Sequence, residues 1–591
     1  MVKEANSEPK KLKDEEKEAF WHSTSHVLAD AVKRLWPSVK LGIGPAIENG
    51  FYYDFDRKES FTADDLARIE EEMKKIVKEN LKFEQVKMPR KEAEALLKKN
   101  GEKYKLDFLK DLPDKEVSFN KHGEFLDLCN SPVIRYTSQI KAIKLLSTAS
   151  AYWKGESKNP MLHRIYGISF HSKTELDNYL AQVEEAKKRD HRKLGKELDL
   201  FCFSDLVGGG LPLYTPKGTI IIDELQKHIE EVCKKYGFQK VKTPHLAKRE
   251  LFEISGHAIK FADELFSVTS PKKHEFALKP VQCPHQTQIY ASKARSYKDL
   301  PIRYMESDKQ YRAEKTGEVG GLNRVYAITV EDGHSFCSVD QVKQEVMNMV
   351  KIIRDFYTSL GLWNNSWVSL SVRDYAHPEK YIGDSKDWDT CEAMLKEISD
   401  EMKLNAKRCE GEAALYGPKL DFMFKDAMGK EIQIPTVQLD FATPKRFGLV
   451  YTNNDGKEST PVMVHRAILG SYERFLVLLI EHFAGAFPIW LSPVQVIILP
   501  IADRHATYAK KVKNELEECG IRVEVDKSQT TTEYKIRDAS MQKIPFMVVV
   551  GDKEEQANTV AVRTREDSKV RYGVPLKEFA KEVQKLIKEK K

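Results

Sequence analysis

The first strongly patterned segment of the chain spans residues 19–37. Its apolar residues recur at three- and four-residue intervals, which is the spacing of one helix face. They are Ala19, Val27, Leu28, Ala31, Val32 and Leu35. Pro37 follows and predicts the end of an amphipathic helix. Residues 1–15 are mostly charged and lack this spacing, so we expect a disordered tail there.

The middle of the chain contains strand-like runs, several of which alternate apolar and polar residues. The runs at 302–304, 310–312 and 323–330 flank residues 315–321, a polar loop with three glycines, so they predict a hairpin. Further strand-like runs, the last leading into a long apolar helix, are 419–424, 431–441 and 462–464. Helices are predicted over 220–236 and 341–362, and a short strand over 239–243.

The pattern changes on both sides of this middle region. Residues 175–200 contain no proline and one glycine, which predicts a long charged helix that links two domains. After residue 490, apolar runs and amphipathic segments follow in the order β-α-β-α-β-β-α. This order predicts a small mixed sheet covered by helices, which a ligand-binding α/β module would also fit.

The length of 591 residues is too great for a single core. We therefore expect a multidomain α+β chain. Its predicted parts are a tail (1–15), an N-terminal domain (16–174), the linker helix (175–200), a central domain (201–489) and a C-terminal domain (490–591).

Composition narrows the class of protein. A hydrophobic content of 41% with 31% charged residues describes a soluble globular protein. The longest apolar stretch, Phe475–Ile480, is too short to span a bilayer, and the N-terminus lacks a signal sequence, so we expect no membrane partner. Eight cysteines without paired spacing indicate reduced thiols and a cytoplasmic location. The net charge of +6 does not by itself indicate a nucleic-acid binder.

Candidate chemistry gathers on the predicted hairpin. Arg312 and Glu314 are two residues apart, so on a strand they face the same side, and Arg324 lies on the partner strand. An arginine fork can bind phosphate, and a carboxylate can accept a hydrogen bond from an amino group. Asp332 and His334 end the run with a carboxylate and a candidate metal ligand. The alternative is an exposed hairpin with ordinary surface charges.

The N-terminal helix carries a second candidate site. His22 and His26 are four residues apart and share one helix face. Two such imidazoles can share a metal ion or lie on either side of a small substrate. The alternative is a pair of histidines packed at a domain surface.

These motifs resemble those of class II aminoacyl-tRNA synthetases, most closely the threonyl-tRNA synthetase family. The hairpin resembles motif 2, the segment ending at Pro244 resembles the dimer-forming motif 1, and the helix with Arg474 resembles motif 3. The resemblance implies an editing-like N-terminal α+β domain, an antiparallel-sheet catalytic domain and a C-terminal α/β anticodon-binding domain. It also implies a homodimer of bacterial type without the family's N-terminal ubiquitin-like domain.

The resemblance further implies that the chain is a threonine–tRNA ligase. ATP, with Mg²⁺, would activate L-threonine to threonyl-adenylate, and tRNA(Thr) would accept the threonyl group. The implied catalytic residues are Arg312, Arg324, Asp332 and Arg474. The implied ATP ligands are Arg312, Glu314, Arg324, Gln433, Thr436 and Arg474. The implied threonine ligands are Asp332, Tyr416 and Gln438, and one zinc ion per subunit would bind Cys283, His334 and His465.

Two further sites are implied with departures from the family pattern. His22, His26, Asp127 and Cys129 match an editing site that hydrolyses Ser-tRNA(Thr), but Val133 replaces the histidine expected four residues after the cysteine. Either the remaining residues suffice, or the domain has lost or changed the activity and serves as a scaffold for the tRNA acceptor end. Arg537, Glu554 and Arg563 match anticodon-contacting positions.

Two other functions stay open on the sequence. The chain could be another class II synthetase, of the prolyl or seryl type, which would lack the Cys/His/His metal set. It could also be a synthetase-like RNA-binding regulator without aminoacylation, although Arg312, Glu314, Arg324 and Arg474 argue against this.

Overall fold

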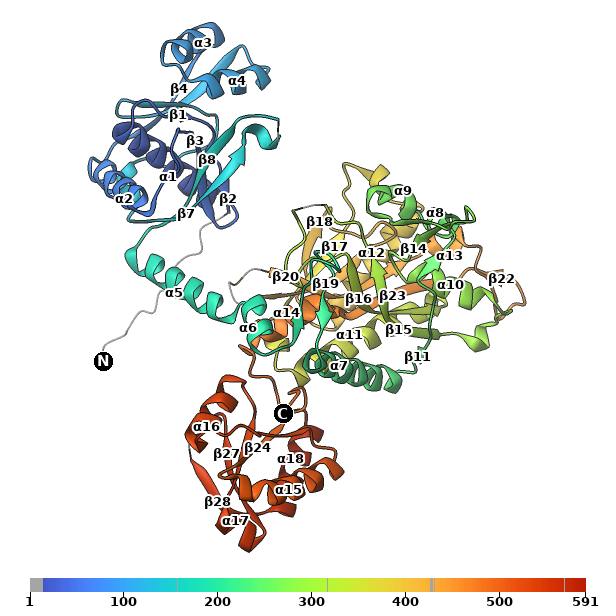
Figure 1. Cartoon of the computed structure of the whole chain (residues 1–591). Coiled ribbons are helices and arrows are strands. Elements are labelled where there is room, and N and C mark those ends of the chain that lie inside the picture. Colours follow the sequence, from blue (N-terminus) through green and yellow to red (C-terminus); the bar gives the residue numbers. More distant parts are fainter. Residues whose placement is uncertain (1–13, 157, 316, 426–428, 430, 568) are drawn as a thin grey trace, which may run out of the picture. The chain divides into compact units, whose positions relative to one another are not determined.

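The computed structural model describes residues 14–591, apart from 157, 316, 426–428, 430 and 568. It divides into two compact units, Met1–Val183 and Glu184–Lys591 (Figure 1). The predicted tail, residues 1–15, lies almost entirely outside the described residues. All eight cysteines are free thiols, as predicted. None of the described helices is long and apolar enough to cross a membrane.

The N-terminal unit packs helix α1 (Asp14–Leu35) against one face of an antiparallel sheet. The strands lie in the order β1 (Lys40–Leu41), β3 (Gly50–Asp56), β8 (Met161–Phe170) and β7 (Ala142–Tyr152), and β2 (Ala46–Ile47) pairs with β3. Helix α2 (Ala63–Lys78) begins with a Thr62–Asp65 capping box and joins the same core. The apolar face predicted for α1 is confirmed, since Val27, Leu28, Ala31 and Val32 are fully buried.

A smaller layer of the same unit presents the second candidate site. Its sheet consists of β4 (Phe83–Pro89), β5 (Glu116–His122) and β6 (Phe125–Leu128), all antiparallel. Helices α3 (Arg90–Lys99) and α4 (Lys103–Asp111) contribute to a core with these strands. Cys129 follows β6 directly, so the end of this strand fixes its position.

The predicted linker helix is two helices. Helix α5 (Lys173–Arg189) ends before Asp190, and α6 (His191–Glu197) begins after it. Asp190 has an extended ψ of 120°, and its carboxylate accepts a hydrogen bond from the Arg192 amide as an N-cap. The single long helix over 175–200 is therefore wrong, because an aspartate in a run of charged residues caps a new helix instead of continuing the first.

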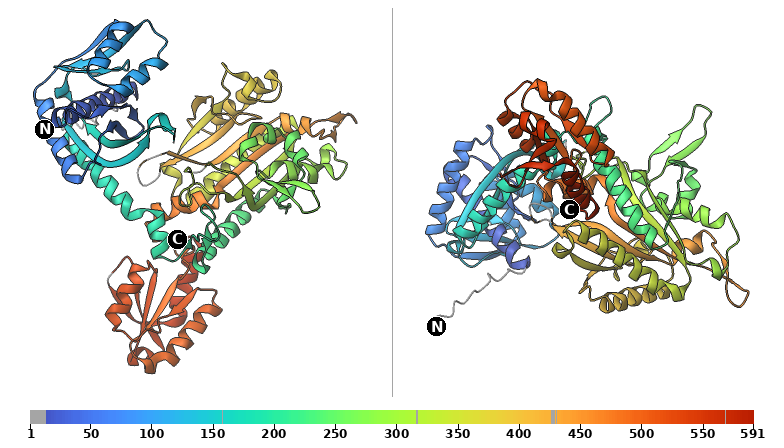
Figure 2. Two further views of the ribbon diagram at one scale, coloured as in Figure 1. Left: turned by 45° about the horizontal axis from the view of Figure 1, so that its top comes forward. Right: turned by 90° about the horizontal axis from the view of Figure 1, so that it is seen from below.

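The second unit is built on an eight-stranded sheet that carries the first candidate site (Figure 2). Its order is β11 (Gln239–Lys240), β15 (Ile302–Tyr311), β16 (Ala327–Cys337), β23 (Val462–Ser471), β20 (Glu431–Asp440), β19 (Lys419–Lys425), β17 (Trp367–Val372) and β18 (Lys407–Glu410). Only the two edge pairs are parallel. Helices α7 (Pro216–Lys235), α11 (Val342–Ser359) and α14 (Tyr472–His482) bury their apolar faces in the core on one side of this sheet.

The remaining elements of the unit are short or peripheral. Helices are α8 (Arg249–Ile254), α9 (His257–Lys260), α10 (Cys283–Ala291), α12 (Ser385–Glu401) and α13 (Ala442–Arg446). Small strand groups are β9 (Phe201–Cys202) with β10 (Leu213–Tyr214), β12 (Leu246–Ala247) with β14 (Glu275–Leu278) and β13 (Ser267–Thr269), and β21 (Tyr451–Thr452) with β22 (Glu458–Ser459).

Strands β16 and β23 extend further along the chain than predicted, and the edge strand β11 is shorter. Strand β23 continues past residue 464 to Ser471, and β16 extends to Cys337 instead of ending at 330. The extensions contain charged residues that broke the apolar pattern. Arg466 and Glu331 form a buried ion pair on the core side of the sheet, with Arg466 fully buried over the Phe238 ring. Each charge compensates the other, so both can occupy interior strand positions.

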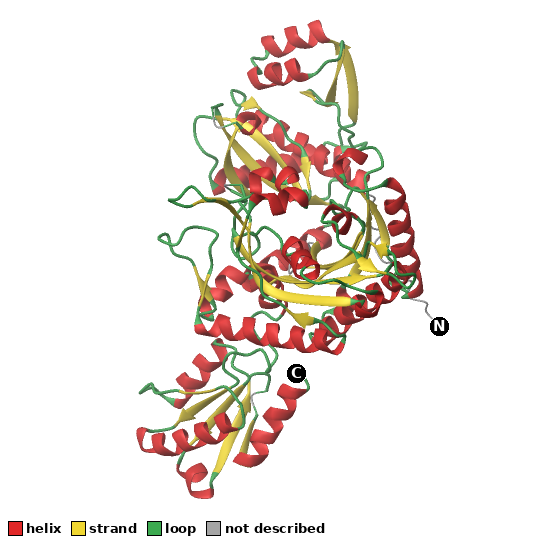
Figure 3. Ribbon diagram, turned by 90° about the vertical axis from the view of Figure 1, so that its right-hand side faces the viewer, coloured by secondary structure: helices red, strands yellow, loops and turns green. Residues whose placement is uncertain are grey.

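The C-terminal part of this unit confirms the predicted mixed sheet with helices. The strands lie in the order β25 (Val523–Val525), β24 (Val496–Pro500), β26 (Phe546–Val550), β27 (Thr559–Thr564) and β28 (Val570–Pro575). Helices α15 (Ala506–Glu518) and α18 (Leu576–Lys588) pack on one face and α16 (Thr532–Met541) on the other (Figure 3). Helix α17 (Asp552–Ala557) and strand β28 were not predicted.

Candidate functional site

One cross-strand row of the eight-stranded sheet brings the candidate residues of the central domain together. His334 on β16 lies opposite His465 on β23, and His465 lies opposite Gln438 on β20. Gln438 in turn lies opposite Lys419 on β19. Directly opposed residues of antiparallel strands point to the same face, so these side chains form one line across the sheet. They lie on the face opposite the helices α7 and α11.

Cys283 completes a buried Cys/His/His cluster. It is the first residue of α10, and the ligand atoms of Cys283, His334 and His465 all lie within 4.8 Å of one another. The exposed fractions are 4%, 0% and 5%, respectively. The two imidazole rings meet edge to face, with centroids 4.7 Å apart. These three residues, which are spread over some 180 positions of the sequence, thus form one cluster.

The polar partners of this cluster leave nitrogen lone pairs that fit a metal ion. His334 Nδ1 lies 2.7 Å from Gln286 Oε1, and His465 Nε2 lies 3.0 Å from the Asp440 carboxylate. Both oxygens only accept, so these nitrogens carry hydrogen. His334 Nε2 is buried and has no hydrogen-bond partner among the described residues. Histidines oriented by an acceptor on the outer nitrogen are typical of metal ligands.

Burial and nearby carboxylates keep the Cys283 thiol protonated in the absence of a metal. Burial chiefly, and then the charges of Asp332 and Asp440, raise the pKa of Cys283 well above its usual value. A metal ion would have to displace this proton, because only the thiolate is a ligand.

The pKa of the Asp332 carboxyl group lies near neutral pH. Burial raises the pKa of Asp332 to about 7, and the neighbouring Glu331 charge adds to the effect. One Asp332 oxygen accepts from the Gly333 amide and lies 3.7 Å from His334 Nε2. A small change in its surroundings therefore decides whether this group accepts or donates a hydrogen bond.

A cavity of about 360 Å³ lies beside the cluster. Its lining includes Arg312, Tyr416 and Gln438, as well as His257 and Lys419. The Tyr416 hydroxyl donates to Gln438 at 2.6 Å, and the Tyr416 ring stacks on the His465 imidazole at 4.5 Å. Three predicted substrate-binding residues thus line the cavity, and the Tyr416 ring lies between it and the Cys283 cluster.

The predicted arginines gather at the same end of the sheet. Arg324 pairs with Glu314 at 2.8 Å and with Glu318 at 2.9 Å. Burial, together with the charges of Arg312 and Arg324, lowers the pKa of Arg474. An anion such as a phosphate would relieve the repulsion among these clustered positive charges.

Arg312, Glu314 and Arg324 lie in the segment between β15 and β16, not on strands as predicted. This segment is longer than the seven-residue loop expected from the glycines. Gln433 and Thr436 precede Gln438 on β20. The Gln433 amide donates to Asp421 at 2.6 Å, and the Thr436 hydroxyl accepts from Gln438 at 3.3 Å. Among the described residues, neither contributes to the lining of the cavity.

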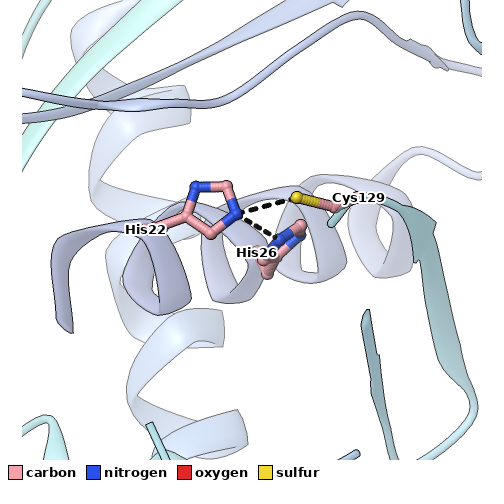
Figure 4. A group of neighbouring side chains, drawn as sticks. All are labelled: His22, His26 and Cys129. Carbon is pink, nitrogen blue, oxygen red and sulfur yellow. Dashed lines mark hydrogen bonds between the residues drawn. The ribbon is translucent and has the colours of Figure 1, made fainter. Parts of the chain in front are cut away.

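The N-terminal unit contains the second cluster (Figure 4). His22 Nε2 lies 3.0 Å from Cys129 Sγ and 3.0 Å from His26 Nε2. Burial lowers the pKa of His22. A cavity of about 300 Å³ borders all three residues and Asp127. The structure therefore brings the four predicted residues of this site together.

Asp127 is a fully buried carboxylate with a lysine at one oxygen and a tyrosine and a histidine at the other. Lys105 Nζ lies 2.6 Å from one oxygen, and the Tyr53 hydroxyl and His26 Nδ1 lie 2.6 Å and 3.0 Å from the other. Burial opposes the charge, but the Lys105 and His26 interactions outweigh it and lower the pKa of Asp127. Asp127 is therefore ionised at neutral pH.

Val133, which replaces the expected histidine, is half-buried and packs against the hydrophobic cluster beneath α1. The anticodon candidates come from three different elements: Arg537 is exposed on α16, Glu554 caps the Gly551 amide at the start of α17, and Arg563 lies on β27. Their role stays a prediction.

The sequence did not identify the residues that orient the ligands. Gln286 is three residues after Cys283 on α10, and Asp440 is two residues after Gln438 on β20, so periodicity places both on the relevant faces. Lys105 and Tyr53 gave no such signal, because they reach Asp127 from distant elements.

Three family models match parts of the chain. Residues 266–483 match the tRNA synthetase class II core domain (G, H, P, S and T), and residues 495–586 match the anticodon binding domain. Residues 117–166 match the threonyl and alanyl tRNA synthetase second additional domain.

Similar proteins cover nearly the whole chain. The threonine–tRNA ligase of Acetivibrio thermocellus is 46% identical over 97% of this chain and 89% of its own length. That of Clostridium tetani is 47% identical over 96% and 87%. Among solved structures, the RNA binding domain of a Cryptosporidium parvum threonyl-tRNA synthetase has a TM-score of 0.63 at 32% identity, covering 67% of this chain and 98% of its own.

Proposed function

Because the chain belongs to the threonine–tRNA ligases, which are class II aminoacyl-tRNA synthetases, we propose that it joins L-threonine to tRNA(Thr) with the residues assigned below. The observation that carries this assignment is the buried Nε2 of His334, which has no hydrogen-bond partner in the described part of the chain. It lies beside Cys283 and His465, next to a cavity that Arg312 lines. A metal site and an anion site adjoin there, as selection of a hydroxy amino acid and its activation with ATP require.

Activation would depend on charge neutralisation and positioning by the arginines. Arg312 would bind the α-phosphate and the charge that develops when the threonine carboxylate attacks it. Arg324 would bind the distal phosphates, Glu314 the adenine amino group, and Arg474 the ATP. Gln433 and Thr436 would contact the nucleotide from β20. In this family Mg²⁺ accompanies the ATP.

Cys283, His334 and His465 would hold one zinc ion per subunit, since a thiolate and two imidazoles suit zinc and leave coordination positions open. Zinc, when bound, supplies open positions for the amine and hydroxyl of threonine. Asp332 would accept the hydrogen bond of that hydroxyl, and Tyr416 with Gln438 would hold the amino acid against the cluster. A site with these partners rejects valine, which lacks the hydroxyl, by roughly 10⁴-fold.

The parts of the chain would divide the work. Residues 201–489 would form the catalytic domain, 490–591 the anticodon-binding domain with Arg537, Glu554 and Arg563 at the tRNA, and 16–174 the editing-like domain, joined through 175–200. We further propose a homodimer that works in the cytoplasm, where its tRNA is charged.

His22, His26, Asp127 and Cys129 would form the site that hydrolyses Ser-tRNA(Thr). Serine retains the hydroxyl, so the catalytic site cannot exclude it by the same means as valine. The cavity at this cluster supports hydrolysis, whereas the apolar packing of Val133 supports the scaffold alternative.

ATP–pyrophosphate exchange with threonine, serine and valine tests the catalytic assignment. The full chain should activate threonine strongly, serine weakly and valine hardly at all. Asp332→Asn should reduce the threonine-to-valine ratio at least tenfold, because the neutral amide oxygen of asparagine accepts the hydroxyl's hydrogen bond more weakly than a carboxylate does. Cys202→Ser, at an exposed thiol, is the matched control. An unchanged ratio in Asp332→Asn would contradict its role.

Hydrolysis of Ser-tRNA(Thr) by the full chain tests the editing assignment. The wild type should release serine, and Cys129→Ala should lower the rate while leaving threonine activation unchanged. A wild type that releases serine no faster than Cys129→Ala would indicate a scaffold.

A further inference from the structure

The neighbours of His26 indicate which of its nitrogens carries a lone pair. The Asn120 side-chain nitrogen, a donor, lies 3.3 Å from Nε2, so Nε2 is the nitrogen that accepts. The other nitrogen, Nδ1, lies 3.0 Å from the Asp127 carboxylate.

His22 Nε2 faces both other members of the cluster, 3.0 Å from Cys129 Sγ and 3.0 Å from His26 Nε2. Two imidazole nitrogens and a sulfur therefore converge on one point, with all ligand atoms within 4.8 Å of one another. Electron-pair donors placed in this way repel one another unless a cation or a proton lies between them.

Cys129 supplies a third donor at the same point. Its sulfur lies 3.0 Å from His22 Nε2 and accepts a hydrogen bond from the Ser131 amide at 3.5 Å. It is the single cysteine among the described residues of the N-terminal unit. The cavity of about 300 Å³ opens onto this side of the cluster, with Pro45 and Phe108 in its wall.

We propose that His22, His26 and Cys129 bind a zinc ion whose fourth position faces this cavity. One thiolate and two imidazoles are a donor set that zinc prefers, and three protein ligands leave one position open. The contact of His26 with Asp127 is the carboxylate–histidine arrangement that orients metal ligands. This inference concerns metal binding alone and does not depend on the ion at Cys283 or on hydrolysis of mischarged tRNA.

The test is the zinc content of the full chain by plasma mass spectrometry. The chain is produced with zinc and dialysed against metal-free buffer. We expect two zinc ions per wild-type chain, one in Cys129→Ala, one in Cys283→Ala and none in the double variant. Cys202→Ser, which removes an exposed thiol, should keep two. The ion that remains in Cys129→Ala tests the catalytic cluster separately.

Cobalt substitution gives a second measurement that does not depend on the Cys129 variant folding. In the Cys283→Ala chain, bound Co²⁺ should show thiolate-to-cobalt charge transfer and tetrahedral visible bands, and His26→Gln should weaken its binding. The proposal is overturned if Cys283→Ala binds no zinc or cobalt, or if Cys129→Ala and wild type hold the same number of zinc ions. Those results would show that a proton bridges the two histidines.

Discussion

The molecule assembles the same three donors, one cysteine and two histidines, on two different scaffolds. In the N-terminal unit, one turn of α1 presents both histidines and the end of β6 presents Cys129. In the second unit, three separate elements are needed: β16, β23 and the first residue of α10. The comparison teaches that a helix can encode a paired ligand locally, whereas a sheet encodes it through register.

The two clusters differ in the charge of one carboxylate that lies beside a histidine of each. Asp127 is ionised because Lys105 lies 2.6 Å away, and the pKa of Asp127 is lowered. Asp332 has Glu331 as its neighbour in sequence, and burial raises the pKa of Asp332 to about 7. The first carboxylate is thus a fixed anion that orients a histidine, and the second can exchange a proton near neutral pH.

The largest expected difference between the clusters is catalytic. Cys283→Ala should lower threonine activation by about 10³-fold, because the metal site loses a ligand and threonine loses its open coordination positions. Cys129→Ala should leave activation within twofold. ATP–pyrophosphate exchange measures both. Equal losses in the two variants would remove the functional distinction between the clusters.

Because Asp127 is a fixed buried anion, the stability of the N-terminal unit should depend on its cationic partner, Lys105. Lys105→Met should destabilise the N-terminal unit by about 3 kcal/mol, because it leaves the buried Asp127 charge unpaired. Hydrogen exchange of the α1 amides measures this locally in the full chain. Adding Asp127→Asn should restore most of the loss. If Lys105→Met leaves exchange unchanged, Lys105 is not what keeps Asp127 ionised.

The difference in scaffolds also explains what the sequence could predict. The helix with His22 and His26 and the C-terminal helix Ala506–Glu518 follow from periodicity, because each buries an apolar face. The extensions of β16 and β23 do not, because the Arg466–Glu331 pair fills interior positions with charge. The cluster at Cys283 was found only by resemblance, since no sequence spacing records which strands are neighbours.

The residues that orient the ligands were missed for the same reason. Lys105 and Tyr53 meet Asp127 through tertiary packing alone. The break between α5 and α6 occurs because Asp190 caps the second helix. An aspartate in a charged run fits either a helix cap or a continuing helix, so the sequence did not predict the break.

A smaller effect should follow from changing the carboxylate behind His465. Asp440→Asn should weaken metal binding at the catalytic cluster by about 10- to 100-fold, because the Asp440–His465 contact at 3.0 Å orients the ring. Competition with a chelator measures the affinity, and threonine activation should fall at limiting zinc. Asp455→Asn, at an exposed turn, is the control. A similar weakening in the control would mean that Asp440 acts only through overall stability.

The smallest expected effect is the pH dependence contributed by Asp332 in the metal-free chain. Its folded pKa of about 7 exceeds the unfolded value of about 3.9, so the folded state holds the proton more tightly. The stability that this supplies is complete below the unfolded value and is lost as the pH rises through about 7. Between pH 6 and pH 8 the loss should be about 1 kcal/mol.

Asp332→Asn cannot titrate and should lack this contribution, so the difference between the two chains isolates Asp332 from the histidines that titrate in the same range. Denaturant unfolding at both pH values, after chelation of metal, measures the difference. If the two chains lose the same free energy between pH 6 and pH 8, Asp332 is already ionised in the folded protein. It would then be a fixed anion like Asp127, and the contrast between the two clusters would reduce to their scaffolds.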